Sequence, residues 1–208
     1  MLIDLNVKKL DIEAAAKIAI KDKKLREELV ENLWSKNETL RYNSHKILFA
    51  ITEQKPEILY SKFDELVKFL DSDNTYHKCS AVWLLANLTQ VDKDDKFEKI
   101  FDKYYSLLDD KSFITAAYVA QASGVIALAK PKLQVKITNR LLSIDKTHHE
   151  QERRDLTKAS IIEAFTQYFD QVKNKKVIID FVQEQLNCQS PKTRKKAKEF
   201  LLQYENTY

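Results

Sequence analysis

Apolar residues recur every three or four positions along almost the whole chain, and no segment alternates apolar and polar residues as a β-strand does. Pro56, Pro131 and Pro191 each stand where a helical stretch begins, a position that tolerates proline. The pattern predicts helices near residues 11–20, 22–34, 37–54, 56–70, 74–91, 94–108, 112–130, 131–144, 153–170, 174–188 and 191–206. The sequence therefore predicts an all-α fold, in which short connections make consecutive helices antiparallel.

The helical pattern repeats along the chain. Leu33, Leu70 and Leu108, spaced by 37 and 38 residues, each end a predicted first helix, and Leu186 follows Leu108 by about two further periods. Four residues after each leucine stands a residue suited to cap the second helix: Asn37, Asn74, Ser112 and Ser190. A two-helix unit is too thin to bury its own apolar face, so such units are stable when stacked. We expect one α-solenoid domain of about five units, at approximately residues 11–54, 56–91, 94–130, 131–170 and 174–206.

The units resemble the HEAT family of two-helix repeats. Residues 37–51 resemble its second helix, and residues 66–73 resemble the end of a first helix with its acidic turn. Members of this family typically carry an aspartate in the turn and a basic residue early in the second helix, a pattern that Asp73 and Lys78 match. The third unit departs from it, with Ala116 at the basic position. The resemblance covers about residues 22–206 and implies a HEAT-like solenoid that acts in scaffolding and recognition.

Composition narrows the class of protein. The 208 residues include one glycine and three prolines, too few for a β-sandwich, a barrel or a glycine-rich nucleotide site. No apolar run approaches the roughly 20 residues that span a bilayer, and the first residues lack the pattern of a secretory signal. Two cysteines, Cys79 and Cys188, do not make a disulfide framework. We expect a cytoplasmic protein with no membrane contact.

The sequence contains no motif of the common catalytic or metal-binding sites. It contains no G-x-S-x-G turn, and one glycine cannot build a phosphate-binding loop. His148 and His149 are metal-ligand types, but adjacent residues on a helix point about 100° apart, and the i, i+4 spacing of a helical metal site is absent. We therefore expect no enzyme, no metal and no cofactor.

The expected function is partner recognition by the second helices. From Cys79 to Leu88 and from Phe113 to Ala129, apolar residues cover nearly the whole circumference, which indicates either burial between neighbours or an open apolar groove. The predicted partner-binding residues are Tyr42, His45, Phe49, Lys78 and Trp83. The polar stretch 145–154 interrupts the repeat, either as a second contact surface or as a solvated loop or helix extension. The sequence specifies neither the partner protein nor an oligomeric state.

Nucleic-acid binding is the alternative. The net charge of +4 arises in residues 171–208, which hold eight basic and four acidic residues. The candidate phosphate contacts are Lys173, Lys175, Lys176, Lys192, Lys195 and Lys196. The same lysines also suit the polar outer face that a terminal repeat needs.

Overall fold

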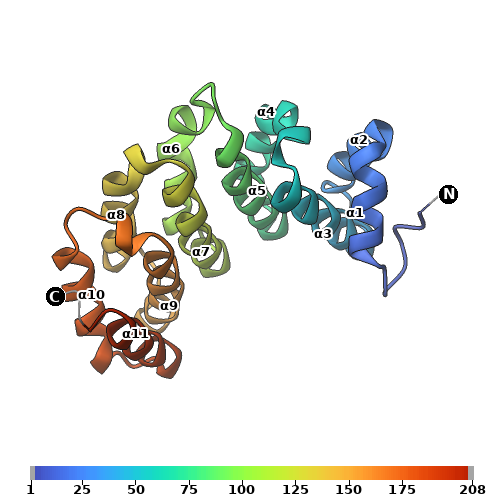
Figure 1. The fold of residues 1–208 in the computed structure, drawn as a ribbon. Helices are drawn as coiled ribbons and strands as arrows, with labels where there is room; N and C mark the ends of the chain where they lie inside the picture. The colour runs from blue at the N-terminus through green and yellow to red at the C-terminus, as the bar shows by residue number, and fades with distance from the viewer. Residues whose placement is uncertain (1–2, 206–208) are drawn as a thin grey trace. The chain divides into compact units, whose positions relative to one another are not determined.

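The computed structural model describes residues 3–205, and all regular structure in that range is helical (Figure 1). The predicted all-α fold is therefore confirmed. No helix within these residues is long and apolar enough to cross a lipid bilayer. The chain divides into two compact units, residues 1–98 and residues 99–208, which we describe separately.

In the first unit, α3 is the central helix. It packs against α1 and α2 on the N-terminal side and against α5 on the other, while α4 packs against α5. Residues 11–54 thus hold three helices rather than a simple pair. The predicted helix over 56–70 is broken into short 3₁₀ turns around α4. The helices are α1 (Ile12–Lys21), α2 (Lys23–Asn32), α3 (Glu38–Gln54), α4 (Phe63–Val67) and α5 (Thr75–Leu88).

In the second unit, α7, α9 and α11 pack against one another in chain order. The contact between α7 and α9 runs along both helices, α11 lies against α9, and α8 and α10 lie against α7 and α11, respectively (Figure 1). Helix α6 (Lys96–Ser106) begins before the division between the units. The others are α7 (Phe113–Ala129), α8 (Gln134–Leu142), α9 (Gln151–Tyr168), α10 (Lys176–Glu184) and α11 (Pro191–Gln203).

Three of the four predicted N-caps are confirmed. The side-chain oxygens of Asn37, Asn74 and Ser190 accept hydrogen bonds of 2.9 to 3.3 Å from amides in the first turns of α3, α5 and α11. Such bonds satisfy donors that have no partner inside the helix. Ser112 precedes α7 as predicted, but its side chain makes no capping bond. Its own N–H instead donates to the Asp110 carboxylate at 3.0 Å.

Arginines early in the second helices secure the turns that precede those helices. Arg41 donates to the Ser35 carbonyl at 2.8 Å, and Arg194 donates to the Cys188 carbonyl at 2.6 Å. Arg154 in α9 likewise reaches the carbonyl of Asp145, at 3.1 Å. The accepting carbonyls belong to the turn or to its 3₁₀ segment, so these bonds tie each second helix to the turn that precedes it.

The predicted insertion at 145–154 is mostly regular structure. A 3₁₀ turn covers Ser143–Lys146 and α9 begins at Gln151, so only residues 147–150 form an irregular turn. This turn is still longer than its counterparts, because six positions separate the last apolar residue, Ile144, from the N-cap, Glu150, instead of four. The departure from the repeat is therefore a two-residue lengthening of one turn.

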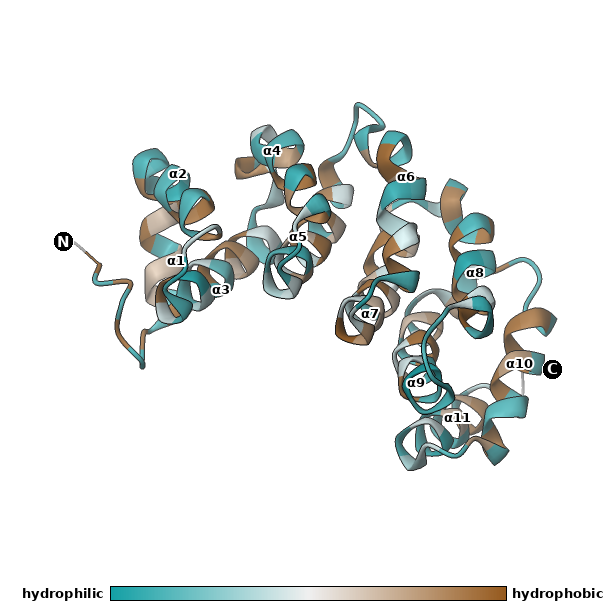
Figure 2. Ribbon diagram, turned by 180° about the vertical axis from the view of Figure 1, so that it is seen from behind, coloured by the Kyte–Doolittle hydropathy of each residue, from teal (hydrophilic) through white to brown (hydrophobic). Residues whose placement is uncertain are grey.

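Most of the apolar surface of α5 and α7 is buried. On α7 the buried set includes Val119, Ala120, Ala122, Ser123 and Ile126, in a helix whose ribbon is mostly white to brown in Figure 2. The exposed apolar residues of α7 are Ile114, Tyr118 and Leu128, each between 36% and 46% exposed. Of the two explanations for the apolar circumference, burial between neighbouring helices accounts for most of it.

Gly124 lies where α7 meets α9, and we expect Gly124→Ala to raise the free energy of unfolding by about 0.5–1 kcal/mol. An added Cβ would lie 2.5 Å from Cδ of Gln167, but that side chain is exposed and its amide end can rotate away. Alanine favours the helix, so the gain should appear in urea denaturation. The same gain is expected when Gln167 is also replaced with alanine. A loss of stability that disappears in the Gln167→Ala background would mean that the contact is rigid.

Candidate functional site

Three predicted partner-binding residues form a line of rings on α3 and α5. The ring centroids of His45 and Phe49 lie 6.1 Å apart, and Phe49 meets Trp83 edge to face at 5.6 Å. His45 and Phe49 share a face of α3 because they are four residues apart, and the packing of α3 on α5 brings Trp83 to them. All three side chains are partly exposed. We call His45, Phe49 and Trp83 the aromatic row.

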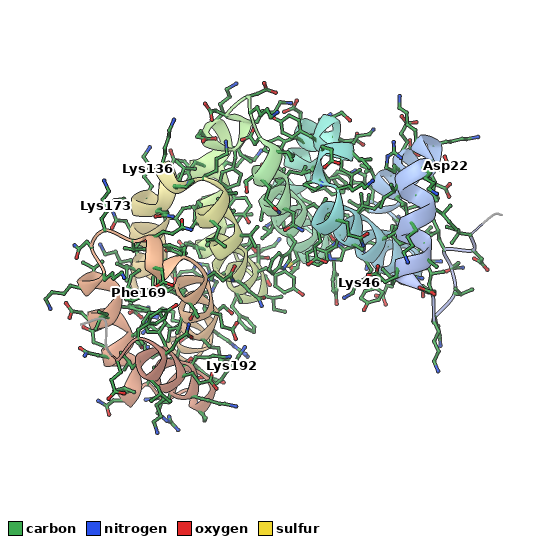
Figure 3. All side chains as sticks on the ribbon, viewed as in Figure 1. Asp22, Lys46, Lys136, Phe169, Lys173 and Lys192 are labelled. Atoms are coloured by element: carbon green, nitrogen blue, oxygen red, sulfur yellow. The ribbon has the colours of Figure 1, made fainter. Side chains whose placement is uncertain are left out.

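Tyr42 extends the aromatic row toward solvent. It precedes His45 by three residues on α3 and is 59% exposed. The Nζ atom of Lys46 lies 5.7 Å from the centroid of the Tyr42 ring, a cation–π arrangement. Lys46 is labelled on the lower side of α3 in Figure 3. Tyr42 and Lys46 thus place an aromatic face and a positive charge beside the row.

Lys78 does not join this surface. Although it was predicted as a partner contact, it is only 8% exposed, in the buried part of α5. A lysine at this depth contributes to the interior of the unit, so the predicted set of five residues reduces to Tyr42 and the aromatic row.

His45 is suited to packing rather than to proton transfer. Burial of the ring and the neighbouring positive charge of Lys46 lower the pKa of His45 to about 4. Its Nδ1 atom is buried and has no hydrogen-bond partner among the described residues. At neutral pH the ring is therefore uncharged.

A second aromatic cluster surrounds the turns of the first unit, and its members were not among the predicted partner-binding residues. Trp34 stacks on Phe69 with centroids 3.9 Å apart and meets His77 edge to face at 5.0 Å. Trp34 remains 45% exposed. The contacts join residues of two consecutive helix pairs, so much of this cluster serves to hold the pairs together.

The six predicted lysine contacts of the C-terminal helices differ in what they already bind. Lys173 and Lys192 have no ion-pair partner within residues 3–205, and they lie well apart in Figure 3, near the starts of the antiparallel helices α10 and α11. Lys176 pairs with Asp180 at 2.8 Å. Lys196 bridges Glu163 and Glu199, and Lys195 also approaches Glu199. Lys175 lies over the ring of Phe169, with its Nζ atom 5.1 Å from the ring centroid. Half of the predicted phosphate contacts are thus already paired with carboxylates.

The second unit also brings together three side chains of types that can bind a metal ion, although Asp109 is far from the two histidines in the sequence. One ligand atom from each of Asp109, His148 and His149 lies within 4.8 Å of the other two. Asp109 ends a 3₁₀ turn (Leu107–Asp109), whereas the histidines occupy the lengthened turn before α9. Because residues 147–150 are not helical, the side chains of His148 and His149 are not held about 100° apart as neighbours on a helix are.

Hydrogen bonds position this cluster. The backbone N–H of His148 donates to Oδ1 of Asp109 at 2.7 Å, and Nδ1 of His148 lies 2.7 Å from the same oxygen. The hydrogen bond from the His148 backbone is the largest influence on the carboxyl of Asp109, and it lowers the pKa of that group. The hydrogen bond from the His148 side chain lowers the pKa further, and together they outweigh the desolvation that raises it. Nε2 of His149 lies 3.2 Å from the Leu108 carbonyl oxygen. The carboxylate is thus held ionised beside the two imidazoles.

Comparison of the chain with protein-family models, curated proteins and solved structures finds a similarity among the solved structures. No protein-family model matches the chain, and no curated protein matches it. Among solved structures, the chain is similar to a crystal structure of an engineered protein, with 18% sequence identity and a TM-score of 0.47. That match covers 97% of this chain and 94% of the other.

Proposed function

We propose that this chain is a HEAT-like α-solenoid that works as a non-catalytic, cytoplasmic scaffold and binds a protein partner through Tyr42 and the aromatic row. The chain-order packing of α7, α9 and α11 and the repeated capping of α3, α5 and α11 support the solenoid. Neither Cys79 nor Cys188 takes part in a disulfide bond, which accords with a reducing compartment.

The observation that carries the proposal is the exposure of the Tyr42 ring on α3, next to the aromatic row, whose rings are only partly covered. Tyr42 is 59% exposed, although a tyrosine in a stable domain usually buries most of its ring. Aromatic side chains are enriched among the residues that dominate binding energy at protein interfaces. Lys46 beside the Tyr42 ring adds a positive charge at the edge of the surface, which suits a partner that is apolar with an acidic margin.

We expect Tyr42→Ala to lower affinity for the partner at least about tenfold without unfolding the protein. The partner is identified by capture on the immobilised chain from a lysate of the source organism, followed by mass spectrometry, and its affinity is then measured by calorimetry. Trp83→Leu should have a similar effect. The matched control is Val135→Ala, which removes an apolar side chain that is 70% exposed on α8 and should leave the affinity unchanged.

Two results would contradict this proposal. One is a partner that binds wild type, Tyr42→Ala and Trp83→Leu with equal affinity. The other is loss of the helical circular dichroism signal in Tyr42→Ala, Phe49→Ala and Trp83→Ala alike, because these residues would then form the core of the unit rather than a site.

Nucleic-acid binding through the lysines is the competing function, and the pairing of Lys176, Lys195 and Lys196 with carboxylates disfavours it. Counterion release makes phosphate binding strongly dependent on salt. The capture should therefore be repeated after nuclease treatment and at raised ionic strength. Recovery that disappears with nuclease, together with binding of a duplex that weakens steeply with salt, would replace the proposed function with this one.

A further inference from the structure

Asp109, His148 and His149 converge from two successive turns of the second unit. Asp109 follows the first helix of one pair, and the histidines follow the first helix of the next pair, 39 and 40 residues later. The backbone bond from His148 to Asp109 fixes the two turns to each other at 2.7 Å. The longer second turn therefore places its two imidazoles over the end of the neighbouring turn.

The three side chains present the donor set of a transition-metal site. Imidazole nitrogen and carboxylate oxygen are the usual ligands of Zn²⁺ in sites with three protein ligands and a water molecule. Bond lengths of 2.0–2.1 Å in a tetrahedron place the ligand atoms about 3.4 Å apart. The present ligand atoms, all within 4.8 Å of one another, need a shift of roughly 1.5 Å at most to reach that arrangement.

The cluster can make this adjustment because its outer members are not held by the core. The side chains of Asp109 and His148 are each 54% exposed, so they can rotate while the helices stay in place. His149 is only 7% exposed and gives the site a fixed inner ligand. The exposed side also leaves room for the ion to enter and for water to complete its coordination.

We propose that Asp109, His148 and His149 bind a divalent transition-metal ion, with Zn²⁺ as the preferred ion, and that the ion clamps the two turns together. The hydrogen bonds among these groups compete with the metal, because Nδ1 of His148 already meets Asp109 and Nε2 of His149 already meets the Leu108 carbonyl. We therefore expect an affinity in the micromolar range. Mg²⁺, which prefers an all-oxygen shell, should not compete.

The test is calorimetric titration of ZnCl₂ into the full chain with every affinity tag removed. One equivalent should bind, and Co²⁺ in place of Zn²⁺ should give the visible absorption of a tetrahedral cobalt site. Zinc should also raise the melting temperature, since a ligand that binds the folded state stabilises it. Excess Mg²⁺ should produce neither the heat nor the shift.

Variants decide whether these residues hold the ion. We expect Asp109→Asn and His148→Ala each to lower zinc affinity at least about tenfold and to abolish the shift in melting temperature. Both side chains are exposed, so these variants test the site even if His149→Ala fails to fold. Glu150→Gln is the matched control, because it removes an exposed carboxylate from the same turn but lies outside the cluster. Absence of zinc binding to the wild type, or equal affinity in Asp109→Asn, His148→Ala and Glu150→Gln, would overturn the proposal.

Discussion

Replacement of Lys158 with alanine is expected to lower the free energy of unfolding by about 3–5 kcal/mol. The Nζ atom of Lys158 lies 2.8 Å from Oδ1 of Asp145 and 3.4 Å from Oδ1 of Asp155. The side chains of Lys158 and Asp155 are only 7% and 5% exposed. Without the lysine, the carboxylate of Asp155 stays in a buried place with no cation beside it, and that uncompensated charge costs more than the lost contact itself.

The control for this prediction is an exposed ion pair of the same length. Lys176 and Asp180 are also 2.8 Å apart, but the lysine side chain is 80% exposed. Lys176→Ala should therefore cost no more than about 0.5 kcal/mol. Urea denaturation of the two variants measures both values. Equal losses at the two sites would contradict the role that we assign to burial.

A further pair of variants separates charge from packing at Lys158. Lys158→Met keeps most of the buried side-chain volume, so it should be nearly as destabilising as Lys158→Ala if the isolated charge of Asp155 is the cause. Adding Asp155→Asn to Lys158→Met should then restore part of the stability. If Lys158→Met alone is as stable as the wild type, the lysine acts through its aliphatic chain.

The second large effect is a loss of stability on mild acidification, caused by His45. Burial and the charge of Lys46 lower the pKa of His45 from 6.5 to about 4 in the folded protein. Between these values the unfolded chain binds a proton at His45 that the folded protein does not, so the free energy of unfolding falls as the pH falls. Well above pH 6.5 the ring is neutral in both states, and the protein keeps the full stability that the neutral ring provides. Its loss reaches about 3 kcal/mol near pH 4.

The measurement compares wild type with His45→Leu by urea denaturation at several pH values between 4 and 6.5. Carboxylates also titrate at the lower end, so the difference between the two proteins reports on His45. The free energy of unfolding should change less steeply with pH in His45→Leu than in the wild type. Phe49→Leu, which alters the neighbouring ring without removing a titratable group, should keep the slope of the wild type. Parallel curves for His45→Leu and wild type would mean that the ring is solvated in the folded state.

The candidate partner surface could be predicted from the sequence only in part. The i, i+4 spacing of His45 and Phe49 places them on one face of α3, and their partly exposed state accords with the predicted surface. The periodicity gave no measure of depth, however. Lys78 was predicted as a partner contact together with them, yet α5 is enclosed by its neighbours and the lysine is buried. The depth of Lys78 depends on how α3, α4 and the 3₁₀ turn Lys68–Asp71 pack against α5, and the apolar spacing within α5 does not contain that packing.

The sequence by itself determined where most of the helices form and how α3, α5 and α11 begin. Asn37, Asn74 and Ser190 cap their helices with bonds that span two or three residues, and the apolar spacing that predicts helices acts over one or two turns. These are local interactions, which a linear pattern contains. Only the tertiary structure brought Asp109 to His148 and enclosed Asp155 with Lys158. The meeting of Asp109 and His148 depends on the length of a turn and on the packing of helix pairs about 40 residues apart, and the enclosure of Asp155 depends on the helices packed against α9.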